Sequence, residues 1–391
     1  MHRRSAADRT KPATRSVAVG AMLVGAVALL AACGGTSTSA PDTSEPATSE
    51  PATSAPATSG PGNELPDNGP QAAASTAPAA PSSGCGSTAG DAGAGRRVIT
   101  VDGTERWYLW TPPEQPTRVT PPPLLLDFHG LAEGAEFHSA MSGLGDLARQ
   151  EGFALATPNG TGDPVAWGIG TGSDNADLRF VEALIEEISA SNCIDVNRIF
   201  ATGLSNGALL SSALACSLSD RIAAIATVAG IADPADCRPS RRVPILNFHG
   251  TDDAILLFNG GVGDLGAALQ GGTPSLPPGY VADLDGTGVP AAVAAWAARN
   301  GCVGSPSDDR QAVDVLRRTY RCPADGEVVS YVIEGGGHSW PGSEVSATLE
   351  PVIGKTTRSI SANEQMWEFF TRHALRAGPV VPTAPDQGEG A

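Results

Sequence analysis

The chain has 391 residues, with 25 Lys and Arg against 42 Asp and Glu, so its formal net charge at pH 7 is −17. Such an acidic balance disfavours nucleic acids and anionic membrane faces as partners. Hydrophobic residues make up 41% of the chain, which is enough for a substantial core, and the length fits one large α/β domain or two smaller domains.

The first 32 residues are typical of a secretory signal. Residues 1–15 carry five basic side chains against the single Asp8, and the apolar stretch that follows is too short for a membrane span. It ends in Leu30-Ala31-Ala32-Cys33-Gly34, which resembles the lipobox of bacterial lipoproteins and implies cleavage before Cys33 and acylation of that residue. An ordinary cleavage site beside an incidental cysteine is the alternative. We therefore expect an exported protein, either secreted or held at the extracellular face of the cell membrane by a lipid anchor alone.

Residues 33–84 consist mainly of Ser, Thr, Pro, Ala and Gly and contain almost no large apolar side chains. Such a segment cannot bury enough apolar surface to offset the entropy lost on ordering, so we expect a disordered linker. The folded domain is expected over residues 85–378, followed by a disordered tail over 379–391.

Within the expected domain, apolar runs of strand length alternate with helix-forming segments. Asp102-Gly103 separates the first two runs and predicts a hairpin with a type I′ turn. The predicted strands are 98–101, 104–110, 124–128, 153–157, 198–202, 222–228, 243–248, 311–320 and 328–333, and the predicted helices are 140–150, 176–190, 206–216, 289–300 and 362–374. This alternation predicts a doubly wound, mostly parallel sheet with helices on both faces. The glycine-rich residues 254–290 are expected to form an irregular, substrate-facing loop.

One strand-like run ends in Gly203-Leu204-Ser205-Asn206-Gly207 and passes directly into a helix-forming stretch. A strand, a sharp turn and a helix in this order hold a serine hydroxyl at the carboxyl edge of the sheet, as in the α/β-hydrolase fold. Gly203 and Gly207 lack the side chains that would collide at such a turn. A Gly-x-Ser-x-Gly match alone is weak evidence in so glycine-rich a chain, but this context makes Ser205 the candidate nucleophile.

A serine nucleophile needs a histidine base, and six histidines are present. His338 follows three glycines after the last predicted strand, late in the chain, as the α/β-hydrolase order requires. His129 and His249 each precede a glycine at a strand end, where histidines more often bind buried backbone groups. His138 is expected to cap a helix or to lie on its solvated surface. We therefore expect His338 to be the base.

The acid of such a triad should follow a strand between the nucleophile and the base. Asp252 and Asp253 both follow the predicted strand at 243–248, and we expect one to orient the base and the other to be structural. In this fold the oxyanion is bound by the amide after the nucleophile, here Asn206, and by an amide of the loop after the third strand, here Leu131.

Of the seven cysteines, Cys33 is assigned to the lipid and six remain, an even number that favours disulfides over a metal site in an exported chain. Six cysteines allow fifteen pairings, which the sequence alone cannot separate. Short sequence separation favours the pairs Cys216 with Cys237 and Cys302 with Cys322. This leaves Cys85 to pair with Cys193. We expect neither a metal nor a cofactor.

Four motifs resemble those of the secreted esterases grouped with polyhydroxybutyrate depolymerases and with feruloyl or acetyl xylan esterases. They are Leu126-Asp127-Phe128-His129-Gly130, the Ser205 motif, His249-Gly250-Thr251-Asp252-Asp253 and Glu334-Gly335-Gly336-Gly337-His338-Ser339-Trp340-Pro341-Gly342. The last is the most specific, and the resemblance runs from about Cys85 to Ala374. It implies a triad of Ser205, Asp253 and His338, because the family acid falls at the last position of His-Gly-x-x-Asp. Trp340 is expected to support or flank the catalytic loop, and to bind substrate there.

We therefore expect an extracellular serine esterase that acts on feruloyl, acetyl or polyhydroxyalkanoate-type esters through an acyl-enzyme. Its partner would be a small or polymeric ester, with no nucleic acid involved, and the protein would be a monomer. A serine peptidase on the same fold and a non-catalytic cell-surface binding module are the alternatives.

Overall fold

The computed structural model describes Ser75 and residues 77–86, 93–113 and 120–375, all within one compact unit, Gln71–Ala391. The expected signal over 1–32, the acylation site Cys33, most of the 33–84 linker and the 379–391 tail lie outside the described residues. No helix in the described part is both long and apolar enough to cross a membrane.

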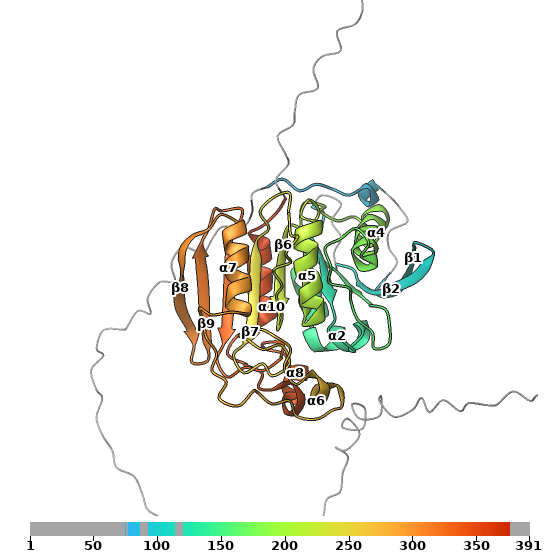
Figure 1. Cartoon of the computed structure of the whole chain (residues 1–391). Coiled ribbons are helices and arrows are strands. Elements are labelled where there is room, and N and C mark those ends of the chain that lie inside the picture. The colour runs from blue at the N-terminus through green and yellow to red at the C-terminus, as the bar shows by residue number, and fades with distance from the viewer. Residues whose placement is uncertain (1–74, 76, 87–92, 114–119, 376–391) are drawn as a thin grey trace, which may run out of the picture. The chain divides into compact units, whose positions relative to one another are not determined.

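Ten strands of the described chain form one sheet in the order β1-β2-β4-β3-β5-β6-β7-β10-β9-β8 (Figure 1). The central strands from β4 to β10 pair in parallel, and the two strands at each edge pair antiparallel. The mostly parallel sheet is therefore confirmed. The strands are β1 (Gly95–Val101), β2 (Thr104–Thr111), β3 (Leu124–Phe128), β4 (Ala154–Pro158), β5 (Ile199–Leu204), β6 (Ala224–Val228), β7 (Ile245–Gly250), β8 (Val303–Ala312), β9 (Val315–Arg321) and β10 (Val328–Ile333).

Helices cover both faces of this sheet, each over its own hydrophobic core (Figure 1). Successive side chains of a strand point to opposite faces, so Leu124 and Leu126 of β3 enter one core and Leu125 enters the other. The first core is closed by α4 (Ala176–Ser191), α5 (Asn206–Ser217) and α7 (Val289–Arg299), and the second by α2 (Ala135–Ser142), α3 (Leu144–Glu151) and α10 (Ala362–Thr371). Short helices η1 (Ser83–Gly86), α6 (Leu265–Leu269), α8 (Glu344–Thr348) and α9 (Glu350–Ile353) lie in the connections.

Two predicted elements differ from the structure. The helix expected over 140–150 is two helices, because Gly143 adopts a left-handed φ of 63° and ends α2 before α3 begins. The strand expected over 311–320 is a hairpin, in which β8 and β9 are joined by a turn at Val313 and Asp314. β8 was not predicted, since it is mostly exposed and contains Pro306, and so lacks the apolar pattern of a buried strand.

Hydrogen bonds to the domain begin before Cys85, the residue at which the folded part is expected to start. Val196 donates its N–H to Ala80 O at 2.9 Å, and Ser82 N–H donates to Ile194 O at 2.9 Å. The buried Asp195 accepts the N–H of Ala80 at 2.9 Å. Hydrogen bonds therefore hold residues 80–82 to the domain without large apolar side chains, and composition does not reveal such contacts.

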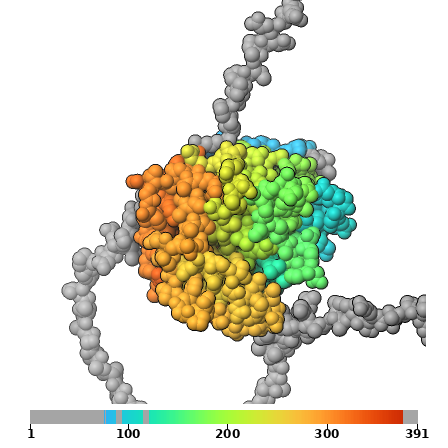
Figure 2. Space-filling model, viewed as in Figure 1, coloured from blue at the N-terminus to red at the C-terminus, as the bar shows by residue number. Residues whose placement is uncertain are grey.

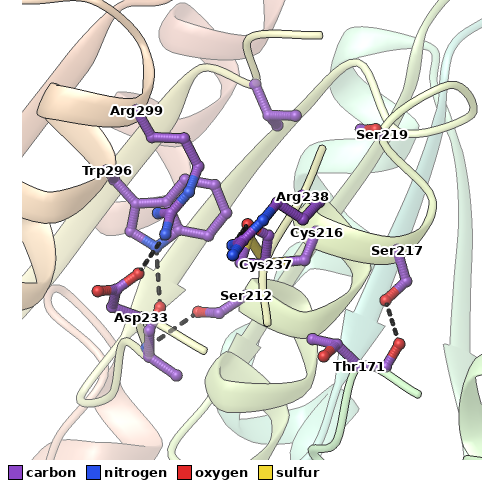
Figure 3. The surroundings of a disulfide bond; sticks show 12 residues. Thr171, Ser212, Cys216, Ser217, Ser219, Asp233, Cys237, Arg238, Trp296 and Arg299 are labelled. Atoms are coloured by element: carbon purple, nitrogen blue, oxygen red, sulfur yellow. Dashed lines mark hydrogen bonds and ion pairs between the residues drawn. A yellow bond between two sulfur atoms is a disulfide. The ribbon is translucent and has the colours of Figure 1, made fainter. Parts of the chain in front are cut away.

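The disulfides have the expected pairing, Cys85–Cys193, Cys216–Cys237 and Cys302–Cys322. Cys216, near the end of α5, is linked to the loop after β6 (Figure 3). Figure 3 also shows how polar contacts fix this loop: Ser212 accepts the N–H of Ala232 at 3.1 Å, and Trp296 of α7 donates to Ala232 O at 2.8 Å. The loop is thus held to helices on either side of it.

Candidate active site

The candidate site residues follow four of the parallel strands. Leu131 follows β3, Ser205 follows β5, Asp253 follows β7 and His338 follows β10. Because these strands run parallel, their carboxyl ends meet at one edge of the sheet. Groups far apart in the chain are thereby brought to a common edge.

Ser205 lies in a strained turn between β5 and α5. Its φ of 54° and ψ of −117° are unusual for a residue with a side chain. The turn also requires glycine on either side: a Cβ on Gly203 would lie 2.6 Å from Phe128 O, and one on Gly207 would lie 2.1 Å from the same atom. Ser205 donates its N–H to Val228 O at 2.9 Å, while its partly exposed hydroxyl makes no hydrogen bond within the described residues. The backbone is therefore held rigidly and the hydroxyl is left free.

His338 and Asp253 are joined by a hydrogen bond of 2.7 Å between Nδ1 and Oδ2. Asp253 is fully buried, and its Oδ1 accepts the N–H groups of Ile255 and Leu256 at 2.8 and 2.9 Å. Burial alone would raise the pKa of Asp253, but His338 and His249 hold it well below its ordinary value. The carboxylate is thus ionised and oriented toward His338.

The His338 imidazole is 6% exposed and has no other hydrogen-bond partner within the described chain. Burial lowers its pKa, but the charge of Asp253 and the hydrogen bond to it, with a smaller contribution from Glu133, raise the pKa above its ordinary value. Asp253 accepts the Nδ1 proton, so the neutral imidazole presents an unprotonated Nε2. That nitrogen is the one that a base would use.

The loops that carry Asp253 and His338 are fixed to each other and to their surroundings. Asp252 donates its N–H to Gly336 O at 2.8 Å, and a Cβ on Gly250 would lie 2.1 Å from that same oxygen. His338 donates its N–H to Ile353 O at 2.6 Å. Asp252 and Asp253 were both candidates for the acid. The Asp252 side chain is exposed, and only the Asp253 carboxylate contacts the His338 imidazole.

In the turn from residue 130 to 133, one backbone N–H has no acceptor within the described structure. Gly130 donates its N–H to Glu133 Oε2 at 2.7 Å, Ala132 donates to Val165 O at 2.8 Å and Glu133 donates to Gly130 O at 3.3 Å. In the described structure, no acceptor binds the N–H of Leu131 or that of Asn206 at the start of α5. The two expected oxyanion donors are therefore both available.

The Asn206 side chain has a separate structural role that the sequence did not suggest. Its Oδ1 accepts the N–H of Trp167 at 2.7 Å, and its Nδ2 donates to Trp167 O at 3.1 Å. Trp167 in turn donates its indole N–H to His129 O at 2.9 Å. The turn between β5 and α5, which we call the elbow, is thus connected to the loop after β3 through the buried Trp167.

Trp340 corrects one expectation, because it is fully buried and presents no surface to a substrate. Its indole N–H donates to Asn363 Oδ1 at 2.8 Å, and its ring meets His138 edge to face at 5.7 Å. The tryptophan therefore supports the His338 loop from within the core. Its position two residues after His338 indicated proximity to the site but not the direction of the side chain.

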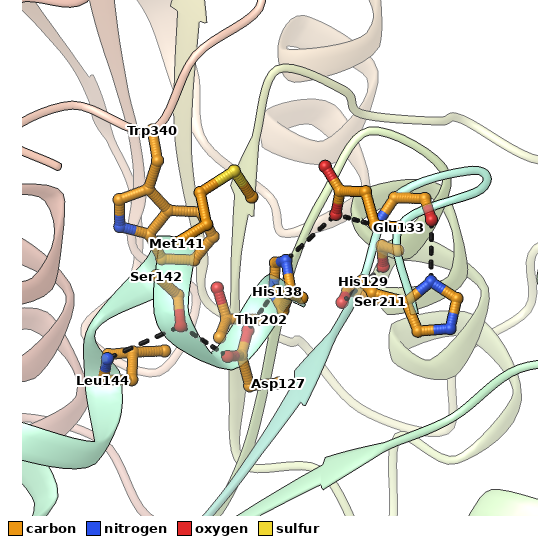
Figure 4. A network of polar contacts seen from close by, with 12 residues as sticks. Asp127, His129, Glu133, His138, Met141, Ser142, Leu144, Thr202, Ser211 and Trp340 are labelled. Atoms are coloured by element: carbon orange, nitrogen blue, oxygen red, sulfur yellow. Dashed lines mark hydrogen bonds and ion pairs between the residues drawn. The ribbon is translucent and has the colours of Figure 1, made fainter. Parts of the chain in front are cut away.

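His129 and His249 bind buried backbone groups, as expected. His129 Nε2 accepts the N–H of Gly160 at 2.9 Å, and His249 Nε2 lies 2.9 Å from Leu256 O. The expectation for His138 is wrong, because this residue is fully buried between the carboxylates of Asp127 and Glu133 (Figure 4). Asp127 interrupts an otherwise apolar strand, and this was the signal that a buried partner had to exist.

The glycine-rich residues 254–290 are largely irregular, as expected, apart from α6 and the start of α7. Figure 2 shows the segment, in gold, on the surface of the visible face. Asn259 holds it together: its N–H donates to the Tyr280 hydroxyl at 2.9 Å, and its side chain binds Val281 O and the N–H of Asp283, each at 2.8 Å. Whether this loop contacts substrate stays a prediction.

No protein-family model matches the chain. Feruloyl esterase B of Piromyces equi is 32% identical over 225 residues, which cover 56% of this chain and 39% of that protein. The putative esterase NocK of Nocardia uniformis subsp. tsuyamanensis is 29% identical over 301 residues, or 70% of this chain and 81% of that protein. Probable feruloyl esterase C of Aspergillus clavatus is 35% identical over 106 residues, or 27% of this chain and 37% of that protein.

Two of these three relatives are matched over well under half of their own length. A solved acetyl xylan esterase from Aspergillus awamori superposes with a TM-score of 0.48 at 14% identity, covering 70% of this chain and 99% of that chain. The α/β-hydrolase fold rests here on the chain's own strand order and its strand-turn-helix elbow. In sequence, the chain is related to esterases, among them feruloyl esterases.

Proposed function

We propose that the protein is an exported serine esterase that hydrolyses carboxylic esters through an acyl-enzyme. Ser205 is the nucleophile, His338 the general base and Asp253 the acid that orients it. The observation that carries this proposal is the 2.7 Å hydrogen bond between buried Asp253 and His338, at the sheet edge that also bears the strained Ser205 turn. The esterase names of the relatives support the same reaction class.

In the acylation step, His338 Nε2 takes the proton of the Ser205 hydroxyl as Oγ attacks the ester carbonyl carbon. The developing oxyanion accepts hydrogen bonds from the amides of Leu131 and Asn206, whose N–H groups have no acceptor among the described residues. Collapse of this intermediate breaks the ester bond, and His338 returns the proton to the departing alcohol. A water molecule, deprotonated by His338, then cleaves the acyl-enzyme and releases the acid.

For the substrate, we propose feruloyl or acetyl esters, such as acetylated xylan. The support is indirect: one relative is called a feruloyl esterase and another a bifunctional acetylxylan esterase/xylanase. Polyhydroxyalkanoate esters remain a second class because of the motif resemblance. We further propose an extracellular location, which three disulfides support, with anchoring through acylated Cys33.

A substrate panel tests the reaction and the acyl preference together. Wild-type protein and Ser205→Ala are compared on p-nitrophenyl acetate, longer p-nitrophenyl esters, methyl ferulate, acetylated xylan and polyhydroxybutyrate. Wild type is expected to release product from at least one ester, faster than from the matching amide, and Ser205→Ala is expected to release none above background. Equal turnover by both proteins would refute the proposal, and amide cleavage as fast as ester cleavage would favour a peptidase.

A further inference from the structure

The network beneath the loop after β3 begins with a buried charge. Asp127 lies in the middle of the sheet and is fully buried. Its Oδ1 lies 2.8 Å from His138 Nε2, and its Oδ2 accepts the hydroxyl of Ser142 at 2.9 Å. An unpaired carboxylate at this depth is strongly unfavourable, so the contact with His138 is what stabilises the Asp127 charge.

His138 contacts a second carboxylate through its other ring nitrogen. Nδ1 lies 3.2 Å from Glu133 Oε2, so each nitrogen faces an oxygen that only accepts hydrogen bonds (Figure 4). Both nitrogens must then donate, which makes the ring an imidazolium. Burial would lower the pKa of His138, but the charges of Asp127 and Glu133 and their hydrogen bonds raise it to about 10. The cation is therefore permanent at neutral pH.

Glu133, which His138 holds in place, also binds the loop that contains Leu131. The oxygen that meets His138 also accepts the N–H of Gly130 at 2.7 Å, directly before Leu131. Together with the Glu133 N–H to Gly130 O bond, this contact closes a tight turn from residue 130 to 133. Within that turn, Leu131 has the one amide that the described protein leaves without an acceptor.

We propose that Glu133, clamped by His138, is a positioning residue: it fixes Gly130, and through Gly130 it orients the next peptide so that the Leu131 N–H points at the developing oxyanion. The expected effect on kcat rests on the proposed esterase function. The role of Glu133 in holding Gly130 does not depend on that function and is tested separately.

The kinetic test compares Glu133→Ala, Glu133→Gln and the control Glu136→Ala, which removes an exposed carboxylate from the first turn of α2. Loss of one oxyanion donor typically lowers kcat by about 10²-fold, so Glu133→Ala is expected to approach that loss with little change in KM. Glu133→Gln should recover most of kcat, since an amide oxygen still accepts from Gly130 and His138. Active sites are counted by fluorophosphonate titration, so that partial unfolding is not mistaken for slow turnover.

Two further readouts separate positioning from a merely structural role. Amide hydrogen exchange of Gly130 should be slow in wild type, Glu133→Gln and Glu136→Ala, and at least about tenfold faster in Glu133→Ala, because only that variant lacks the acceptor. The acidic limb of the kcat/KM profile should also move to lower pH in Glu133→Gln. His338 faces the charges of Asp253 and Glu133, and removing the second lowers its pKa.

If Glu133→Ala does not fold, Glu133→Asp replaces it, since the shorter side chain keeps a negative charge in the network but draws its oxygen back from the Gly130 amide. Unchanged Gly130 exchange in the variant that lacks this contact, or wild-type kcat per titrated site, would overturn the inference. Turnover that persists in Ser205→Ala would instead overturn the proposed function, while the exchange measurement still decides the role of Glu133.

Discussion

Replacing Asp253 with Asn changes one oxygen to an amide nitrogen and leaves the shape of the side chain intact. Oδ1 of Asp253 accepts two backbone N–H groups, from Ile255 and Leu256, so the Asn oxygen is expected to take that position. Its amide nitrogen then faces His338 Nδ1 and donates to it. The imidazole proton is thereby driven to Nε2, which can no longer accept the proton of Ser205.

A wrong tautomer of this kind lowers kcat by about 10⁴-fold in serine hydrolases with a buried acid, or about 5 kcal/mol of transition-state stabilisation. The assay is steady-state hydrolysis of p-nitrophenyl acetate, with sites counted by fluorophosphonate titration. The matched control is Asp252→Asn, whose exposed carboxylate does not contact the imidazole, and we expect it to stay within about twofold of wild type.

The pH profile provides an independent check on the same pair. Neutral His338 is the base, so activity should rise with pH as the imidazolium loses its proton. Burial lowers the pKa of His338, but Asp253 raises it more, so the residual activity of Asp253→Asn should have its midpoint at lower pH than wild type. Wild-type activity in Asp253→Asn, or the large loss in Asp252→Asn instead, would refute this assignment.

Gly207→Ala should abolish fluorophosphonate labelling, because its Cβ would lie 2.1 Å from Phe128 O and force the elbow apart; labelling at the wild-type rate would contradict the tight packing. Replacing Cys85 and Cys193 by Ala opens a loop with a sequence separation of 108 and should lower the free energy of unfolding by about 5 kcal/mol in urea titrations. A loss below about 1 kcal/mol would show that the backbone contacts suffice there. Trp340→Phe should lower the melting temperature and leave KM unchanged, since the indole is fully buried and its N–H is hydrogen-bonded. A raised KM with an unchanged melting temperature would instead indicate that Trp340 contacts the substrate.

The central strands were predictable because both of their faces are buried. The runs 124–128 and 328–333 are continuously apolar or nearly so, and their bounds agree with β3 and β10. The Asp102-Gly103 turn was equally predictable, since both residues adopt the positive φ that this pair favours. β8 was not, because an exposed edge strand needs no apolar pattern.

For the site, strand ends and chain order were sufficient to identify Asp253 and His338 as candidates, and the structure joins them. Side-chain direction was not accessible in the same way. Trp340 follows His338 closely but points into the core, and His138 meets Asp127 only because α2 packs against β3. Such contacts depend on tertiary packing, which no local pattern records.

The central claim is that Ser205 carries a nucleophilic hydroxyl activated by His338. Its most direct test is mass spectrometry of the intact and digested protein after exposure to a fluorophosphonate. We predict one phosphonyl adduct per chain, located on Ser205, absent in Ser205→Ala and formed far more slowly in His338→Ala. An adduct on another residue, or labelling that is unchanged in Ser205→Ala, would contradict the account.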